Sequence, residues 1–440
     1  MIRFLQISDI HFSDLSGGDD EYAQMKCKFL EDIKECHKAM GTIDYVLICG
    51  DIAFSGLDTQ YKKAREFIKE ICENTACDKD NVFMVPGNHD KKREVYSRTR
   101  SMMKEQLLKG KNTKTLLESK VKEPMAVGIL YAPFKQYYKL AAEHLNISDV
   151  ALKAAVFPES DQEKGGIPRF EPGDSMYWTE QLGEMKGFRL AIHGSNTSLL
   201  SDKDDGESWN MKEGKHLQVL PLQAYNVTAE TDEIHILMLH HPMSEIQDGN
   251  KIGKDIDSRF KLQFYGHIHK QSSSAEGAIK IYSGALMPNE DEENIEYFPV
   301  YNVIEIDVVE EVNTPSLKVE VFSRKWDGVK FVEYPEETKT GENALKVDLP
   351  RNDSWKKTME KIKRGKPTII ETEIAESLSP HAIKHAFLNS DHTGKIIKQM
   401  YGKKFDGISQ NQIRNLTFLK QVEDDNRFDE LNELSAKYGK

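Results

Sequence analysis

Residues 45–56, YVLICGDIAFSG, join an apolar run to a glycine and a carboxylate. The first five have the length and composition of a buried β-strand, and Asp51 follows Gly50 at the end of that run. In an open α/β sheet, ligands bind beyond the carboxyl ends of the strands. The segment therefore predicts a central strand that delivers Asp51 to a ligand-binding edge.

The flanking sequence continues this alternation of short apolar runs and helical patterns. Strands are expected at 2–7 and 82–85 and helices at 22–40 and 59–72, which indicates an α/β sheet. Residues 91–180 lack a comparable series of strands, so we expect a mostly helical insertion or lid there. Further strands are expected at 188–193, 234–239, 262–265 and 279–282, followed by a hairpin of 301–309 with 317–321 that has one wet face.

The chain has 440 residues, which exceeds what one compact core usually holds. We expect an α/β domain over 1–332, a polar linker or edge segment containing Pro and Gly over 333–353, and a small helical module over 354–440. The module is supported by the helical spacing of Trp355, Met359 and Ile362, and by Ser379-Pro380 as the start of a helix.

Composition excludes several classes of protein. The apolar runs are far shorter than the about 20 residues of a membrane-spanning helix, and no cationic leader precedes the first one. We therefore expect a cytoplasmic chain that does not enter a membrane. The five cysteines show no CxxC spacing, which argues against both a disulfide framework and a thiolate zinc site.

Five short blocks place candidate metal ligands directly after expected strands. They are Asp9-Ile10-His11, Gly50-Asp51, Gly87-Asn88-His89-Asp90, His240-His241 and Gly266-His267-Ile268-His269. Each block alone has an ordinary explanation as a turn or a strand end, but their joint occurrence indicates a metal centre. The nitrogen and oxygen donors suit Mn, Fe, Zn or Co. Because one ion cannot use so many ligands, we expect two ions about 3.5–4 Å apart that share a carboxylate, for which Asp51 is the natural candidate.

The series DIH, GDIAFSG, GNHD, HH and GHIH resembles the calcineurin-like metallophosphoesterase superfamily over roughly residues 1–325. The resemblance implies an α/β fold, a four-layer α/β/β/α sandwich, here with a helical insertion and a small helical C-terminal domain. It implies a dinuclear hydrolase in which Asp9, His11, Asp51 and His269 hold the first ion. Asp51, Asn88, His240 and His267 would hold the second, with His241 as the alternative to His240. His89 would be the catalytic histidine, and Asp90 would orient it.

The resemblance also implies two divalent ions, with Mn favoured and Fe, Zn, Co or Mg as alternatives, and attack by a hydroxide that bridges them. Ile52 and Ala53 follow Asp51, where serine/threonine phosphatases usually carry a further acidic residue and an arginine. The pattern is thus more similar to the phosphodiesterase and nuclease-type branch. We expect hydrolysis of a phosphodiester of a nucleotide or nucleic acid, with a phosphomonoesterase or protein phosphatase as the alternative.

Charge is unevenly distributed along the chain. The net charge is -12, but residues 91–122 hold 11 Lys and Arg against 3 Asp and Glu. This segment would attract a polyanion to the metals, with Lys92, Arg93 and Arg98 as candidate substrate contacts; a solvated helix face is the alternative. A second basic cluster over 356–366 indicates either helical surface or a docking site. In the latter case the chain would be an enzyme subunit that is active only in a complex, docked to a protein partner through 354–440.

Overall fold

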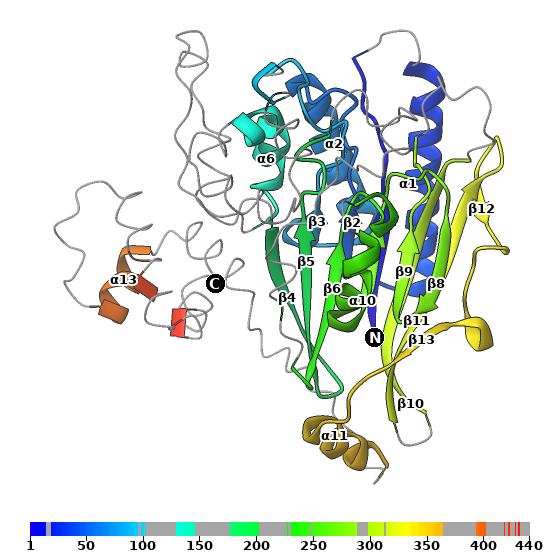
Figure 1. Cartoon of the computed structure of the whole chain (residues 1–440), viewed down its shortest axis with the longest axis vertical. Coiled ribbons are helices and arrows are strands. Elements are labelled where there is room, and N and C mark those ends of the chain that lie inside the picture. Colours follow the sequence, from blue (N-terminus) through cyan, green and yellow to red (C-terminus); the bar gives the residue numbers. More distant parts are fainter. Residues whose placement is uncertain are drawn as a thin grey trace. The chain divides into compact units, whose positions relative to one another are not determined.

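Two β-sheets face each other in the computed structural model (Figure 1). The structure describes residues 1–14, 19–95, 98–100, 102, 129–145, 177–201, 227, 230–246, 249–287, 298–311, 314–363, 393–401, 418, 421–422, 427 and 430–431. By contacts the chain divides into two units, Met1–Lys357 and Thr358–Lys440. Both sheets belong to the first unit.

The first sheet has seven strands in the order β12-β11-β10-β1-β2-β3, and β13 also pairs with β11. Its strands are β1 (Ile2–Ile7), β2 (Tyr45–Ile48), β3 (Val82–Met84), β10 (Val300–Glu311), β11 (Thr314–Trp326), β12 (Phe331–Glu333) and β13 (Leu345–Asp348). Strands β1, β2 and β3 are parallel, whereas β10 to β13 run antiparallel to their neighbours. The parallel strands are short and almost wholly buried, as expected for strands covered on both faces.

The hairpin of β10 and β11 confirms the alternation found in the sequence. Ile304, Ile306 and Val308 are buried, while Glu305 and Asp307 are partly exposed. Ile306 pairs with Val319 of β11, which points to the same side. One face of the hairpin therefore packs inside and the other meets water.

The second sheet has six strands in the order β4-β5-β6-β7-β9-β8. They are β4 (Tyr177–Met185), β5 (Phe188–Ser195), β6 (Glu233–Met238), β7 (Phe260–Tyr265), β8 (Ser272–Glu276) and β9 (Ala278–Tyr282). The four central strands are parallel, and the edge strands β4 and β8 are antiparallel. The rings of Phe4 on β1 and Phe264 on β7 lie 5.8 Å apart, which shows that the two sheets pack on each other.

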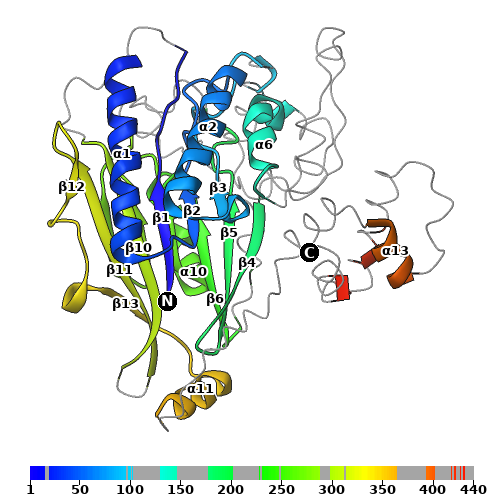
Figure 2. The same cartoon turned by 180° about the vertical axis from the view of Figure 1, so that it is seen from behind.

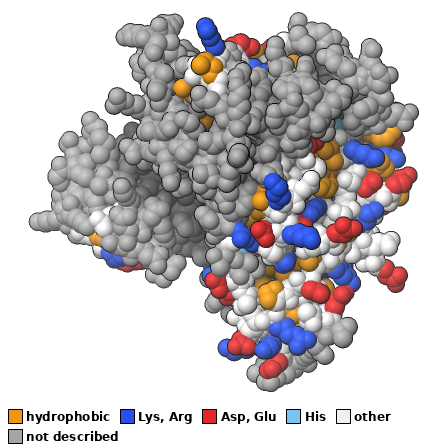
Figure 3. Space-filling view, in the orientation of Figure 1, with side chains coloured by type: hydrophobic (Ala, Val, Ile, Leu, Met, Phe, Trp, Pro, Cys, Tyr) orange, Lys and Arg blue, Asp and Glu red, His pale blue; other side chains and the backbone are white. Residues whose placement is uncertain are grey.

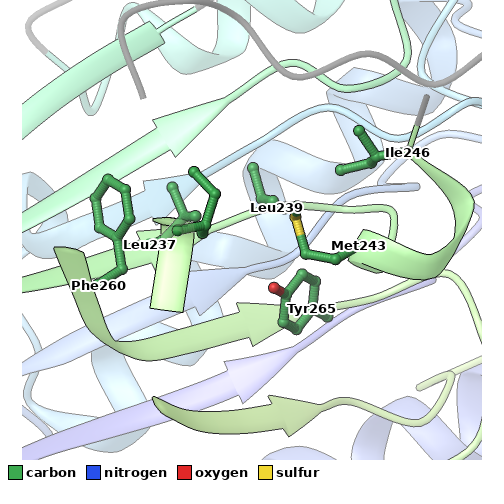
Figure 4. Close-up of a cluster of buried hydrophobic side chains, with 7 residues drawn as sticks. Leu237, Leu239, Met243, Ile246, Phe260 and Tyr265 are labelled. Carbon is green, nitrogen blue, oxygen red and sulfur yellow. The ribbon is translucent and has the colours of Figure 1, made fainter. Parts of the chain in front are cut away.

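Helices cover the outer faces of the two sheets. Helices α1 (Asp19–Met40) and α2 (Asp58–Thr75) lie over the first sheet, as the view from behind shows (Figure 2). Helix α10 (Gly249–Arg259) lies over the second sheet and contacts β7. Ile256 of this helix belongs to a cluster of buried apolar side chains that also includes Leu239, Met243, Ile246 and Tyr265 (Figure 4). The layers therefore follow the expected α/β/β/α order.

Two segments in which no strand was predicted each carry one. The predicted linker over 333–353 contains β13, in which Leu345 pairs with Val319 of β11, so this segment extends the first sheet. The end of the predicted insertion carries β4, while its described middle is helical, with η2 (Ala132–Phe134) and α6 (Lys135–Ala141). The rest of 103–176 lies outside the described residues.

The predicted helical module is described only in part. Helix α11 (Asp353–Lys363) begins where Asn352 Oδ1 accepts a hydrogen bond from Trp355 N, and α13 covers Thr393–Tyr401. The predicted helix start at Ser379 lies outside the described residues. Docking of a protein partner through 354–440 stays a prediction. None of the described helices combines the length and apolar character that crossing a bilayer demands.

Candidate metal centre

The five blocks follow five strands that end at one edge of the sandwich. Asp9 and His11 follow β1, Asp51 follows β2, and Asn88 and His89 follow β3 in the first sheet. In the second sheet, His240 and His241 follow β6, and His267 and His269 follow β7. Backbone bonds tie the blocks together: Asp9 N donates to Gly50 O at 3.0 Å, and Gly266 N donates to His240 O at 3.0 Å.

The backbone at these positions adopts a conformation that most residues avoid. Seven non-glycine residues of the described chain have a positive φ, and five of them are predicted ligands: Asp9, His11, Asp51, His267 and His269. Their φ values lie between 51° and 69°. Left-handed backbone costs of the order of 1 kcal/mol or more per residue and concentrates at functional sites. The edge therefore maintains local strain in order to orient these side chains.

One group of donors forms around the carboxylate of Asp9. Asp9 Oδ1 lies 3.1 Å from His269 Nε2, and the ring of His11 lies 5.5 Å from that of His269. Asp9, His11 and His269 each offer a ligand atom within 4.8 Å of one another. His11 Nε2 is also 3.4 Å from Asp51 Oδ2. This is the set predicted for the first ion.

A second group of donors forms around His240. Its Nε2 lies 3.1 Å from Asn88 Oδ1 and 3.2 Å from Asp51 Oδ2. Its Nδ1 lies 2.8 Å from the carbonyl of Cys49, which can only accept, so Nδ1 carries a proton and Nε2 faces the other donors. His267 offers a further ligand atom within 4.8 Å of that of His240. This set matches the one predicted for the second ion.

Asp51 lies between the two groups. One oxygen, Oδ2, is near both His11 and His240, while Oδ1 accepts a hydrogen bond from His89 N at 2.7 Å. Gly87 is required beside it, because a Cβ at that position would lie 2.0 Å from Asp51 Oδ1. The structure thus brings Asp51 next to both groups, and its role as a shared carboxylate stays a prediction.

The charges of the buried groups depend on one another. Burial acts to raise the pKa of Asp9 and Asp51, but His269 beside Asp9 and His240 beside Asp51 hold both pKa values below their usual range. Burial acts to lower the pKa of His240, but Asp51 raises it to about 10. The carboxylates therefore stay ionised. Cations that bind here would displace protons from the histidines, which couples their affinity to pH.

His241 has the features of an inward-facing donor. It is fully buried, and its Nδ1 lies 2.8 Å from Thr197 Oγ1. Its Nε2 has no hydrogen-bond partner among the described residues. Nε2 belongs with the donors of His240 and His267 in one group that could hold an ion. A buried unpaired nitrogen beside carboxylates and other imidazoles fits a divalent transition metal, so the residues present suit the group that the sequence implies.

His89 and Asp90 occupy different environments. His89 Nδ1 lies 2.9 Å from Phe54 O, and its ring is 4.9 Å from that of His11. Burial lowers the pKa of His89. The ring is thus held through Phe54. The expected orienting bond from Asp90 is not among the bonds of the described residues.

Asp90 instead connects two loops. Its buried carboxylate accepts hydrogen bonds from Ile52 N (3.2 Å), Ala53 N (2.9 Å), Gly87 N (2.9 Å) and Tyr61 Oη (2.8 Å). Burial and the nearby charge of Asp51 raise its pKa to about 6. Asp90 therefore fixes the loops that carry Asp51 and His89.

Two residues near the histidines were missed in the sequence. Thr197 follows β5 at the same edge and contacts His241, and the polar run GSNTS, which begins at the end of that strand, could have signalled it. Glu245 follows the HHP block, and its Oε2 lies 3.0 Å from His267 Nε2. A single glutamate four residues after a histidine pair carries no recognisable pattern.

The predicted substrate contacts differ in position. Lys92 and Arg98 are exposed, and Arg93 is half-buried. Arg93 is close enough to His89 to add a small lowering effect to that of burial on the pKa of His89. On the face in Figure 3, cationic and anionic side chains are mixed over the described residues. Most of the basic segment 91–122 lies outside the described residues.

Several known proteins are similar to parts of this chain. An uncharacterized metallophosphoesterase-like protein, YydB of Bacillus subtilis (strain 168), is 24% identical over 299 residues, which cover 66% of this chain and 54% of YydB. The chain thus spans about half the length of the curated relative it matches. A single mutant of Vps29 from Entamoeba histolytica matches with 11% identity and a TM-score of 0.29, over 79% of this chain and 99% of that one.

NAD nucleotidase of Haemophilus influenzae matches with 13% identity and a TM-score of 0.28, over 83% of this chain and 56% of that one. The family model of the calcineurin-like phosphoesterases matches residues 2–271, which is more than half of the chain. This range contains all five blocks. The chain belongs to the calcineurin-like phosphoesterase family.

Proposed function

We propose that the chain is a two-metal hydrolase that cleaves phosphodiester bonds of a nucleotide or nucleic acid. The observation that carries the proposal is the position of Asp51, whose Oδ2 lies 3.4 Å from His11 Nε2 and 3.2 Å from His240 Nε2. A carboxylate between two donor groups is the arrangement that a pair of ions requires.

The proposed ligands divide between the two groups. Asp9, His11, Asp51 and His269 hold the first ion, and Asp51, Asn88, His240 and His267 hold the second, with His241 available beside them. When bound, two divalent cations, of which Mn is favoured, would lower the pKa of a water between them and neutralise the phosphoryl oxygens. The protein contributes a fixed and largely buried set of donors whose backbone is already in the required conformation.

His89 is proposed to act on the leaving oxygen. Its Nδ1 is engaged by the carbonyl of Phe54, so Nε2 is the atom that exchanges a proton with the substrate. Its backbone N–H is bonded to Asp51, which fixes its distance from both groups of ligands. As an imidazolium, with its second proton on Nε2, this half-buried ring can protonate the departing oxygen or stabilise charge on the phosphoryl group.

A diester is favoured over a monoester by the residues beside Asp51. Ile52 and Ala53 are buried, and their backbone N–H groups donate to Asp90. Neither position therefore offers an acidic side chain or an arginine to a terminal phosphate. Arg93, which is half-buried near His89, supplies a cation for one non-bridging oxygen.

The test compares aryl esters in the presence of Mn²⁺. We expect the purified chain to hydrolyse bis-aryl phosphate faster than mono-aryl phosphate, with the His89→Ala variant as the blank. The reverse ratio would replace the diester proposal with a monoesterase. A panel of cyclic nucleotides, single- and double-stranded DNA, RNA and a phosphopeptide then identifies the substrate class.

A further inference from the structure

Glu245 is an acidic residue beside the metal centre that belongs to none of the five blocks. Its Oε2 lies 3.0 Å from His267 Nε2, and both side chains are about one quarter exposed, 28% and 26%. A carboxylate oxygen at this distance from a ring nitrogen accepts a hydrogen bond from it. One of the two nitrogens of His267 is therefore engaged on the side that faces Glu245.

The turn that carries Glu245 is held rigidly. Glu245 ends the short helix η4 (Met243–Glu245), in which Glu245 N donates to Pro242 O at 2.9 Å. Its neighbours Met243 and Ile246 are buried with Leu239 and Tyr265 in the apolar cluster of the second sheet (Figure 4). The position of Glu245 is thus set by core packing, which an exposed surface glutamate lacks.

His267 is held at its backbone as well. Its N–H donates to Asp9 Oδ2 at 3.1 Å, and its φ is 69°. The backbone of His267 is therefore tied to the first group of donors. Its ring faces those of His240 and His241, with centroids 5.1 Å and 4.5 Å away. Glu245 contacts Nε2 of this ring.

In each histidine of the second group, one ring nitrogen lies within hydrogen-bond distance of a neighbouring residue. Nδ1 of His240 contacts the Cys49 carbonyl, and Nδ1 of His241 contacts Thr197 Oγ1. In His267 it is Nε2 that has such a contact, with Glu245. Metal-bound histidines commonly donate their second N–H to a carboxylate or carbonyl, which selects the tautomer and strengthens the ligand.

We propose that Glu245 is a positioning residue for the second ion and acts through His267. It accepts the Nε2–H of His267, which fixes the ring and leaves the Nδ1 lone pair for the ion. The negative charge of the carboxylate also makes Nδ1 a stronger donor. This inference rests on the proposed two-metal function. It adds Glu245 as the residue that orients His267 for binding of the second ion.

The test measures binding of Mn²⁺ to the full chain by calorimetry. His269→Ala and His267→Ala identify the binding events of the first and second ion. In Glu245→Ala we expect the Kd of the second ion to rise about 10- to 100-fold, with the first ion little changed. Glu245→Gln, whose amide oxygen still accepts from Nε2–H, should recover most of that loss. The exposed Glu276 supplies the matched control, Glu276→Ala, which should bind as the wild type does.

A double-mutant cycle tests whether Glu245 acts through His267. If it does, Glu245→Ala costs no further affinity in the His267→Ala background. Wild-type affinity for the second ion in Glu245→Ala would overturn the inference, as would equal losses in the Gln and Ala variants or a full additional loss in the double variant. Failure of the wild type to bind two ions would instead overturn the proposed function.

Discussion

The second sheet holds two groups of histidines that differ in what surrounds them. His240, His241, His267 and His269 follow strand ends and meet Asp9, Asp51 and Asn88. His193 and His235 lie inside β5 and β6, where His193 Nε2 and His235 Nδ1 are 2.9 Å apart. Tyr177 Oη lies 2.6 Å from His193 Nδ1, and Glu233 Oε2 lies 3.2 Å from His235 Nε2.

The difference shows what separates a structural histidine from a candidate metal ligand. All ring nitrogens of the interior pair have partners, and within the described part of the chain the pair belongs to no group that could hold an ion. At the strand ends, the left-handed backbone turns imidazoles and carboxylates toward one point. The interior pair therefore supports the sheet, and the edge group is the candidate metal centre.

The largest effect is expected from Asp51→Asn. An amide carries no charge and cannot be shared between two cations as a carboxylate is, so turnover should fall below detection. The measurement is kcat/KM with Mn²⁺, together with a thermal melt that shows the variant is folded. Turnover close to that of the wild type would contradict the role assigned to Asp51.

His89→Ala should have the next largest effect. Loss of the proton donor lowers kcat by about 10²- to 10⁴-fold, while Mn²⁺ binding is retained because both groups of ligands remain. The matched control is His235→Gln in the interior pair, which should leave kcat unchanged. Equal losses of kcat in the two variants would remove the distinction between edge and interior.

Substitution of two glycines, Gly87 beside Asp51 and Gly194 beside Trp178, compares the candidate centre with the interior of the sheet. Gly87→Ala places a Cβ 2.0 Å from Asp51 Oδ1, and Gly194→Ala places one 2.1 Å from the ring of Trp178. We expect Gly87→Ala to displace the shared carboxylate and lower kcat about 10²-fold. Gly194→Ala should lower the free energy of unfolding by about 1–3 kcal/mol and leave kcat unchanged. The reverse pattern would show that the centre tolerates displacement of Asp51.

The smallest effect is expected on the pH dependence of stability, with kcat unchanged. Burial, with a contribution from His235, lowers the pKa of His193 to about 3. Between pH 6.5 and 3 the unfolded chain binds a proton at this residue that the folded chain does not bind, so stability falls as pH falls. His193→Gln should therefore reduce the slope of unfolding free energy against pH in this window by about 1.4 kcal/mol per pH unit. Denaturant unfolding at several pH values measures this slope. An unchanged slope in His193→Gln would contradict the lowered pKa of His193.

Much of the centre could be predicted because its signals are local. Each candidate ligand follows an apolar strand, and the carboxyl ends of such strands meet at one edge. The strands at 45–49, 234–239 and 301–309 were placed within about two residues of their observed limits, which is ordinary for pattern-based boundaries.

The rest depends on contacts that no local pattern carries. The bonds of Asp90 go to backbone N–H groups of another loop, and Glu245 reaches His267 only because core packing places its turn. Strand β13 was missed because LKVD is short, polar at alternate positions and stabilised by pairing with β11. Tertiary structure decides these features, so sequence periodicity cannot reveal them.

The number of Mn²⁺ ions that the chain binds tests the central claim most directly. Equilibrium dialysis followed by elemental analysis should find two ions per wild-type chain and fewer than two in Asp51→Asn. The interior variant His235→Gln should still bind two. One ion or none in the wild type, or two ions bound with unchanged affinity in Asp51→Asn, would contradict a dinuclear centre built around Asp51.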